Sequence, residues 1–528
     1  MRNGAAALKR IDSTLIESLR SPESYSHTVD SIELIETHVS WVLLTGTFAY
    51  KIKKPVRLGF LDFRDLEDRR FYCEEEVRLN RRWAPEIYLD VVPISMHARG
   101  PLVGGEGPPV EYAVRMRQFD QSRRLDIQLD ENELSLHDMD ELANIIALRH
   151  RSADMIGPAG RKETLSVIKG AMWDNLDALE GQLPATKQQA LRRWTAERLD
   201  TLEPVMRKRF DDGCVRECHG DLHLTNLVRL PSGITAFDCL EFSADLRNTD
   251  VMADIAFLVM DLVSRERSDL AYRFLNRYLE VCGDYGGMQV FALYLGYRCL
   301  VRAKVALIRS RERTSDSDAT VDLSRVLEYC DMALRETRHR TPLLVVMHGL
   351  SGSGKTWLST RLLSALPAVR IRSDIERKRM FGLSESADSG SAVARGIYTE
   401  AANSDLYNEL HRLAATTLRT GHDVILDASY LKFSQREHAC RIAADCGAGF
   451  VFLHTTAPVS VLRDRILIRA SGGRQPSEAD IEVLEYQLDN IEPLRPAEQR
   501  VAVERDTSAI TGTEDLCRRL RQCKADLP

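Results

Sequence analysis

The chain lacks long apolar runs, a cysteine framework and a strong excess of charge, and each absence excludes a class of function. No uncharged apolar stretch approaches the roughly 18 residues that a membrane-spanning helix needs. The 11 cysteines of the 528 residues are scattered, without a CxxC pair or a common zinc spacing, which indicates reduced thiols in the cytosol. The formal net charge of −6 argues against a generally basic nucleic-acid-binding surface.

The N-terminal stretch MRNGAAALKRIDSTL also lacks the apolar core and cleavage pattern of a signal peptide. We therefore expect a cytoplasmic protein that does not associate with a membrane. The composition, 44% hydrophobic and 28% charged, is ordinary for a globular protein, and the length predicts two to four domains.

The first part of the chain, to about residue 118, is predicted to be rich in β-strands. HVSWVLLTGTFAYKIKK indicates two strands joined at a turn over residues 45–47. IYLDVVPI and EYAVRMRQF predict two further strands on either side of the turn-rich segment GPLVGGEGPP, and DLEDRRFYCEEEVRLNRRW has helical spacing. From about residue 134 the pattern is mostly helical, interrupted by a polar segment over 214–242.

The order of predicted strands and helices changes after the polar segment RERTSDSDAT. This segment predicts a linker, and a connecting helix over 321–337 is expected to follow it. Beyond it, an apolar strand, a glycine-rich loop and a helix come first, and strands such as DVILDA and GFVFLHT then alternate with helices. This alternation is typical of a parallel α/β sheet. The predicted division is a first domain over 1–310, a linker over 311–340 and a second domain over 341–528.

The segment GLSGSGKT fits the phosphate-binding pattern GxxxxGK[ST], between a predicted strand and a predicted helix. Its backbone N–H groups can surround phosphate oxygens, and the helix N-terminus adds partial positive charge. The lysine would contact the β and γ phosphates of ATP, and the threonine hydroxyl would bind Mg²⁺. The candidate residues are Gly349, Ser351, Gly352, Ser353, Gly354, Lys355 and Thr356.

Two carboxylates follow this loop. Asp374, 19 residues after Lys355, is placed by the pattern at the end of a short strand, where it can act as the general base; the alternative is a helix-capping aspartate. Arg377 would share its helical face. Asp427, at the end of VILD, either orients Mg²⁺ or caps the next element.

Arg465 and Arg469 are four residues apart, so one helix face carries both guanidinium groups. They can close over the nucleotide and neutralise charge on the transferred phosphoryl group, or they form a solvated face. Residues 341–528 resemble P-loop kinases of the polynucleotide-kinase and zeta-toxin group, which carry a P-loop, an Asp-x-x-Arg pair and an arginine-bearing lid. The resemblance implies that Asp374 is the base, Arg377 a substrate or phosphate contact, and Arg465 and Arg469 lid residues.

The polar segment in the middle of the chain contains HGDLHLTN, residues 219–226. Its Asp221 and Asn226 have the spacing of the HxDxxxxN loop of protein kinases. In that chemistry the aspartate lies beside the acceptor hydroxyl and the asparagine binds Mg²⁺. Asp238, at the end of a predicted strand, is the expected second metal ligand, and Glu241 is a further candidate beside it.

A lysine and a glutamate earlier in the chain complete this set. Lys51 ends a strand and can hold the α and β phosphates, although Lys53 shares its face of the strand. Glu76 can orient the lysine through an ion pair, and of the three successive glutamates it alone falls on the apolar helix face of Leu79 and Trp83.

Residues from about 30 to 310 resemble the aminoglycoside-phosphotransferase-like branch of the protein-kinase-like fold, whose form of the loop is HGDLHxxN. The resemblance implies that Asp254 is a structural aspartate and that residues 116–119 bind adenine through the backbone. Two departures stand out: Gly46 alone replaces a GxGxxG loop, and the DFG equivalent reads Phe-Asp-Cys.

The expected fold is an α+β bilobal protein-kinase-like domain followed by an α/β P-loop NTPase domain with a parallel sheet. The expected function is a two-domain phosphotransferase that uses ATP and Mg²⁺ to phosphorylate hydroxyl groups. One alternative makes one domain a nucleotide sensor for the other, and another makes the C-terminal domain a polynucleotide 5′-hydroxyl kinase. A small-molecule acceptor is favoured over nucleic acid because no aromatic and basic tract is present.

Overall fold

The computed structural model describes residues 14–58, 61–312, 316–338, 340–391, 395–471, 478–509 and 512–525. The N-terminal stretch in which we expect no signal peptide lies largely outside the described residues. None of the described helices is long and apolar enough to cross a membrane. The chain divides into two compact units, the first formed by residues 1–134, 148–171 and 209–258, and the second by 135–147, 172–208 and 259–528.

The first unit contains a six-stranded antiparallel sheet in the order β1-β2-β3-β8-β6-β7, against which helix α2 (Leu66–Asn80) packs. Alternating residues of its strands enter two cores, so that Tyr50 and Ile52 point to one face and Ala49 to the other. The strands are β1 (Glu33–Glu36), β2 (Ser40–Leu44), β3 (Phe48–Lys53), β6 (Tyr88–His97), β7 (Gly100–Val103) and β8 (Pro109–Arg117).

Strand β7 is a strand that the sequence did not predict, formed by the first four residues of the turn-rich segment GPLVGGEGPP. Leu102 and Val103 alternate between intermediate and buried positions, and β7 pairs with the end of β6. Pairing along the sheet edge satisfies the backbone of a segment whose glycines and prolines indicate a loop, so the tertiary context overrides the local signal.

After the sheet come helices and two short β-ribbons. The loop 219–226 lies between β9 (Val215–Glu217) and β10 (Leu227–Leu230), and its last three residues form the 3-10 turn η4 (Leu224–Asn226). β9 pairs with β12 and β10 with β11. The remaining elements of this region are β4 (Arg57–Leu58), β5 (Leu61–Asp62), α3 (Leu125–Asp130), α4 (Leu136–Ser152), α5 (Arg161–Ala178), α6 (Ala185–Asp211), β11 (Gly233–Ala236), α7 (Ala244–Arg247), β12 (Asn248–Asp250) and α8 (Val251–Ser264).

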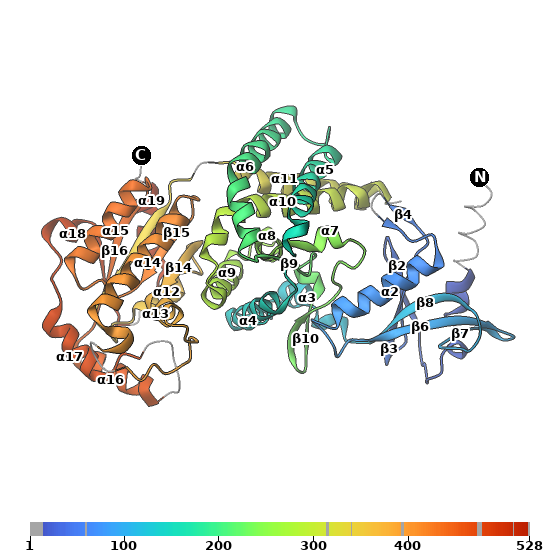
Figure 1. Cartoon of the computed structure of the whole chain (residues 1–528), viewed down its shortest axis with the longest axis horizontal. Helices are drawn as coiled ribbons and strands as arrows, with labels where there is room; N and C mark the ends of the chain where they lie inside the picture. Colours follow the sequence, from blue (N-terminus) through green and yellow to red (C-terminus); the bar gives the residue numbers. More distant parts are fainter. Residues whose placement is uncertain are drawn as a thin grey trace. The chain divides into compact units, whose positions relative to one another are not determined.

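The second unit contains a five-stranded parallel sheet in the order β14-β15-β13-β16-β17, with helices flanking it (Figure 1). Its central strand β13 is buried along its whole length, as expected for an apolar strand of a parallel sheet. The strands are β13 (Leu343–His348), β14 (Ala368–Arg372), β15 (Asp423–Asp427), β16 (Gly449–Thr456) and β17 (Ala502–Asp506). The helices are α12 (Lys355–Leu362), α13 (Ser373–Met380), α14 (Glu400–Leu418), α15 (Phe433–Asp445), α16 (Val459–Ser471), α17 (Ile481–Asn490), α18 (Pro496–Arg500) and α19 (Glu514–Ala525).

The connecting helix predicted over 321–337 is present, but the described residues of the linker expected before it, 311–312 and 316–320, are helical as well. Helix α10 (Met288–Glu312) runs into it, and α11 (Asp316–Glu336) begins inside it and packs along α10. Val326 and Cys330 are buried on the face of α11 that packs on α10, and once that part of the helix is fixed, the polar residues before it extend the helix by adding one hydrogen bond each. Helix α9 (Ser268–Cys282) precedes this pair.

The fold class predicted from the sequence is confirmed. The N-terminal part of the chain has the protein-kinase-like arrangement of an antiparallel sheet with one packed helix, followed by mainly helical structure, and the C-terminal part is an α/β P-loop domain with a parallel sheet.

Candidate active sites

The first candidate site lies at the carboxyl ends of the strands of the parallel sheet. The P-loop follows β13, Asp374 follows β14 and Asp427 is the last residue of β15. Because neighbouring parallel strands end at the same edge, these three groups come together there, where α/β sheets bind ligands. Asp374 is not at the strand end, as the sequence indicated, but in the first turn of α13, since β14 ends at Arg372.

The glycines of the P-loop have no room for a side chain. Gly349 has φ +148°, and a Cβ atom there would lie 2.5 Å from the carbonyl oxygen of Thr455. Gly352 has φ +80°, and its Cβ would lie 2.7 Å from the carbonyl oxygen of Leu462. The loop is therefore packed closely against β16 and α16, with glycine required by both conformation and space.

Side chains from distant segments hold the P-loop in place. Ser353 Oγ lies 2.8 Å from Thr455 Oγ1, and the Ser351 N–H donates to Gln487 Oε1 at 2.7 Å. Thr507 Oγ1 donates to the carbonyl oxygen of Ser353 at 2.9 Å. These bonds fix the loop shape before any phosphate binds, which reduces the ordering cost of binding.

Lys355 bends back over its own loop. Its Nζ donates to the carbonyl oxygens of Gly349 at 3.0 Å and Leu350 at 2.8 Å. Burial lowers the pKa of Lys355 to about 8, against the opposing attraction of Asp427 and Asp374. The ammonium group thus lies in the loop that would surround the phosphates.

Oxygen donors suited to Mg²⁺ lie beside this lysine. Thr356 Oγ1 is 3.3 Å from Asp427 Oδ1, and Ser359 Oγ donates to Asp427 Oδ2 at 2.9 Å. A hydroxyl and a carboxylate are the hard oxygen ligands that Mg²⁺ prefers when nucleotide phosphates supply the rest. The donor set of Thr356 and Asp427 therefore fits this ion.

Asp374 is half-buried, and none of the described residues donates a hydrogen bond to its carboxylate. It nevertheless acts electrostatically on Lys355 and Arg469, which places it near the P-loop lysine. A carboxylate in this position has the lone pairs available to accept a proton from a bound hydroxyl group.

The three predicted arginines bind protein acceptors. Arg377 is buried and donates to the carbonyl oxygen of Ile397 at 2.8 Å and to Asn403 Oδ1 at 2.7 Å. Arg465 donates to the carbonyl oxygen of Gly352 at 3.2 Å, and Arg469 donates to the carbonyl oxygen of Ala479. Arg465 thus contacts the P-loop, whereas Arg377 contacts both α14 and the segment before it.

The second candidate site lies in the first unit, where the predicted lysine meets two acids. Lys51 Nζ is 2.8 Å from Glu76 Oε1 and 2.5 Å from Asp238 Oδ1. Lys51 comes from β3, Glu76 from α2 and Asp238 from the segment after β11. The structure therefore brings together three candidates that lie far apart in the sequence.

The competing lysine, Lys53, is fully buried in the same cluster. Its Nζ is 2.8 Å from Glu76 Oε2 and also pairs with Glu241. Burial would raise the pKa of Glu76, but Lys51 and Lys53 together lower it to about 2. Lys53 thus neutralises Glu241 and shares Glu76, and Lys51 alone of the two reaches Asp238.

The loop 219–226 places the carboxylate of Asp221 beside Asn226, one of the two predicted metal ligands. Asn226 Nδ2 donates to Asp221 Oδ2 at 2.9 Å, and His223 Nε2 lies 3.3 Å from the same oxygen. The Asp221 side chain remains 36% exposed, so a substrate hydroxyl can reach it. Carboxylate and amide oxygens such as those of Asp238 and Asn226 fit Mg²⁺.

Asp238 has a backbone conformation that non-glycine residues rarely adopt, with φ +61°. The surrounding structure supports it: the Asp238 N–H donates to Tyr88 Oη at 3.1 Å, and the Cys239 N–H donates to Asn80 Oδ1 at 2.8 Å. Strain of this kind concentrates where a side chain must be aimed for function.

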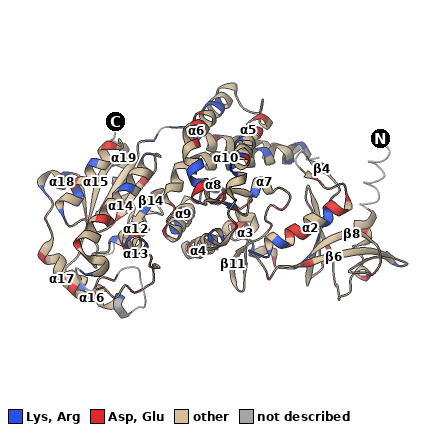
Figure 2. Cartoon of the chain, viewed as in Figure 1, with Lys and Arg blue, Asp and Glu red and all other residues tan. Residues whose placement is uncertain are grey.

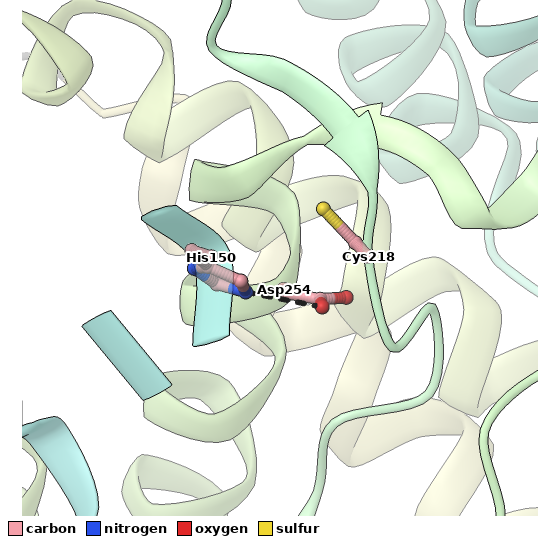
Figure 3. Close-up of side chains that lie close together, drawn as sticks. All are labelled: His150, Cys218 and Asp254. Atoms are coloured by element: carbon pink, nitrogen blue, oxygen red, sulfur yellow. Dashed lines mark ion pairs between the residues drawn. The ribbon is translucent and has the colours of Figure 1, made fainter. Parts of the chain in front are cut away.

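Asp254 braces the start of the loop by accepting the N–H groups of His219 at 2.8 Å and Gly220 at 3.0 Å. Figure 3 shows Asp254 pointing toward His150, whose Nε2 lies 3.4 Å away, with Cys218 beside them. The ligand atoms of these three buried residues lie within 4.8 Å of one another, as a metal site requires. Because both Asp254 oxygens already accept backbone N–H groups, we interpret the group as support for the loop.

Several contributors were not found from the sequence. The pair of Lys53 with Glu241, the contact of Tyr88 with the strained Asp238, and the bonds from Gln487 and Thr507 to the P-loop join residues with no common spacing. Only Glu241, three residues after Asp238, had a local signal.

The chain is similar to a protein family over part of its C-terminal half and to uncharacterized proteins over most of its length. Residues 344–494 match a family model described as an AAA domain. The uncharacterized protein Rv2004c of Mycobacterium tuberculosis is 30% identical over 454 residues, which cover 85% of this chain and 88% of that protein. An uncharacterized protein of Mycobacterium bovis, Mb2027c, matches to the same extent.

Solved structures are similar to one or the other part of the chain. A gluconokinase from Sinorhizobium meliloti is 23% identical, with 36% of this chain and 95% of that chain covered and a TM-score of 0.25. An ethanolamine kinase from Plasmodium vivax is 12% identical, with coverages of 59% and 85% and a TM-score of 0.36. A thermostable mutant of the aminoglycoside phosphotransferase APH(4)-Ia is 15% identical, with coverages of 58% and 95% and a TM-score of 0.33.

Proposed function

The chain belongs to the same family as the uncharacterized mycobacterial protein Rv2004c, and from this premise we propose that it is an ATP-dependent phosphotransferase with two active sites. We assign one site to residues 1–310 and the other to residues 341–528, joined by residues 311–340. Each site moves the γ-phosphoryl group of ATP to a hydroxyl group. The observation that carries the proposal is the meeting of Lys51 with Glu76 and Asp238.

In the first site, Lys51 holds the α and β phosphates while Glu76 keeps its ammonium group in place. Asp221 accepts the proton of the acceptor hydroxyl as the acceptor oxygen bonds to the γ-phosphorus. The bond from this phosphorus to the bridging β–γ oxygen breaks in the same displacement, so the products are ADP and a phosphate monoester. Asn226 and Asp238 are the residues that would hold Mg²⁺.

In the second site, the N–H groups of the P-loop surround the phosphates and Lys355 exchanges its two carbonyl partners for phosphate oxygens. Asp374 accepts the proton of the acceptor hydroxyl, and the bonds form and break as in the first site. Thr356 and Asp427 would hold Mg²⁺. In both sites the bound ion would neutralise charge on the phosphates and fix their orientation.

The acceptor is proposed to be a small molecule. Acidic and basic residues are interspersed along helices such as α2 (Figure 2), and the chain as a whole carries a net charge of −6. Nucleic-acid binding without sequence preference needs a continuous basic groove with aromatic platforms, and neither the composition nor the sequence supplies one.

The test measures transfer of γ-³²P from ATP to a panel of small alcohols, sugars and 5′-hydroxyl oligonucleotides. The wild-type chain is compared with Asp221→Asn and Asp374→Asn, which keep the size of each side chain but remove its basicity. Each variant is expected to lose one set of labelled products by at least about 100-fold and to keep the other. A wild-type chain that labels nothing, or Asp221→Asn with every product intact, contradicts the two-site proposal.

A further inference from the structure

Arg370, in strand β14, has a buried guanidinium group that bonds to two different helices of the second unit. β14 is an edge strand of the parallel sheet, so one side of it lacks a partner strand. Arg370 is 3% exposed. A buried charge at a sheet edge is costly unless it is paired and hydrogen-bonded, and the partners of Arg370 therefore indicate what it is held for.

Helix α9 supplies the negative charge. Glu280 Oε1 accepts from Arg370 Nη2 at 2.6 Å and from Nε at 3.1 Å, and Glu280 is itself 3% exposed. Burial would raise the pKa of Glu280, but Arg370 and Arg372 lower it below its usual value, so the acid is ionised. The guanidinium is thus held by a charge-assisted bond on one side.

Asn276 of the same helix takes the place of a missing strand. Its Oδ1 accepts the Arg370 N–H at 2.6 Å, and its Nδ2 donates to the carbonyl oxygen of Ala368 at 2.8 Å. This side-chain amide satisfies the edge of β14 as a neighbouring strand would. Helix α9 is therefore fixed to β14 through both the backbone and the side chain of Arg370.

On its other side Arg370 reaches the helix that follows the P-loop. Its Nη1 donates to Thr360 Oγ1 at 2.5 Å and to Ser359 Oγ at 3.2 Å. Ser359 is fully buried, and its Oγ lies 2.9 Å from Asp427 Oδ2 and 3.1 Å from the carbonyl oxygen of Thr356, so the shorter bond and the charged acceptor favour donation to Asp427. A hydroxyl that accepts a hydrogen bond from a cation becomes a stronger donor to a carboxylate. The contacts form a continuous path from Glu280 to Asp427.

We propose that Glu280, Arg370 and Ser359 are positioning residues for the Asp427 carboxylate. They hold its Oδ2 oxygen toward α12 and leave Oδ1, which lies 3.3 Å from Thr356 Oγ1, to face the metal. The inference rests on the proposed function, in which Thr356 and Asp427 bind Mg²⁺. It adds that a glutamate in α9, 147 residues before Asp427 in the chain, sets the metal affinity of the P-loop site.

Loss of Glu280 weakens metal binding for a physical reason. Without its partner, the buried guanidinium of Arg370 is left with a positive charge that attracts another carboxylate, and Asp427 is joined to it through Ser359. An Asp427 bonded to a guanidinium group is a poorer ligand for a cation. Loss of Ser359 instead leaves Asp427 Oδ2 without its hydroxyl donor, so the carboxylate is no longer fixed.

The test uses the full chain with Asp238→Asn, a change that weakens the metal site of the first unit. Mn²⁺ is titrated by electron paramagnetic resonance in the presence of a non-hydrolysable ATP analogue. Ser359→Ala and Glu280→Gln are each expected to raise the Mn²⁺ dissociation constant by about 10-fold or more, the usual effect of losing a residue that orients a ligand. The double variant is expected to raise the dissociation constant by less than the product of the two single fold-changes, since both residues act on one path.

Two matched controls lie on α12, the helix that carries Ser359. Thr360→Val removes a hydroxyl that Arg370 contacts but that does not reach Asp427, and Arg361→Gln changes an exposed arginine that stacks on Trp357. Both are expected to change the dissociation constant less than 2-fold. Thermal unfolding without Mn²⁺ or nucleotide shows that each variant is folded at the titration temperature.

The outcomes separate the two proposals. If the Asp238→Asn parent binds no Mn²⁺ with the analogue, the function proposed for the second site is wrong. If the parent binds and Ser359→Ala binds equally well, the positioning role alone is wrong. An equal loss of affinity in Thr360→Val also contradicts it, because the effect would then come from α12 as a whole.

Discussion

Lys51 Nζ lies 2.8 Å from Glu76 Oε1, which joins the middle of the first sheet to the helix packed on it. The other oxygen of the same carboxylate forms an ion pair with Lys53, so one fully buried carboxylate is paired with two ammonium groups. This arrangement makes Glu76 important for stability as well as for the proposed site.

Glu76→Gln is expected to destabilise the first unit by about 3 kcal/mol or more, because removal of one partner leaves buried charge unpaired. Transfer by the first site is expected to fall with it, while transfer by the second site persists. Urea unfolding followed by tryptophan fluorescence measures the change. Glu74→Gln, on the same helix, is the control, because Glu74 pairs with Arg70 at an exposed position and such pairs contribute less than about 1 kcal/mol.

The contribution of Glu76 is also expected to depend on pH. Burial opposes ionisation, but the two lysines lower the pKa of Glu76 in the folded protein from 4.5 to about 2. The stabilisation is therefore complete above pH 4.5 and is lost as the pH falls toward 2. The difference between the free energies of unfolding of wild type and Glu76→Gln, measured from pH 6 to pH 3, should be constant above pH 4.5 and shrink toward pH 3. A constant difference across this range would show that ionisation of Glu76 is not involved.

Nucleotide binding at the second site is expected to take up a proton above pH 8. Burial lowers the pKa of Lys355 from 10.5 to about 8, and phosphate oxygens would raise it again. At pH 8.5 part of the lysine is neutral before binding and charged after it, whereas at pH 7 it is charged throughout. Calorimetric titration with Mg²⁺ and ADP in buffers of different ionisation enthalpy measures this uptake. Lys355→Arg, which stays charged, should show no uptake at either pH.

Gly352→Ala is expected to abolish nucleotide binding at the second site, because the added Cβ would lie 2.7 Å from the carbonyl oxygen of Leu462. Gly382→Ala is the matched control: Gly382 also has a positive φ, +68°, but has no atom within 4 Å of the added Cβ. It should cost only the conformational strain, roughly 1–2 kcal/mol. Fluorescence of a labelled ADP on the Asp238→Asn background reports binding, and equal binding by both alanine variants would contradict the steric argument.

Local patterns in the sequence were sufficient wherever the structure depends on neighbours along the chain. The strand before the P-loop and the strand that ends at Asp427 were predicted from their apolar runs, and the helix over 66–80 from its spacing. The same spacing selected Glu76 from three consecutive glutamates, since the helical period alone decides which one faces the sheet.

The helix over 321–337 was predicted, but strand β7 and the first residues of α11, 316–320, could not be predicted in this way. Their composition is polar or turn-forming, yet α11 packs on α10 and β7 pairs with β6. Strand β17 and the bond from Thr507 to the P-loop gave no local signal either. In each case a partner distant in sequence supplies the burial or the backbone hydrogen bonds, and that gain exceeds the small local preference.

The sequence by itself determined the two sets of chemical groups, because phosphate-binding glycines, lysines and carboxylates must occur at fixed local spacings. Only the tertiary structure decided which groups meet. It directed Lys51 toward Asp238 and Lys53 toward Glu241, bound Arg377 to Ile397 and Asn403, and connected Glu280 to Asp427 through Arg370 and Ser359. Buried charges must find partners wherever the fold places them, and spacing along the chain does not encode that choice.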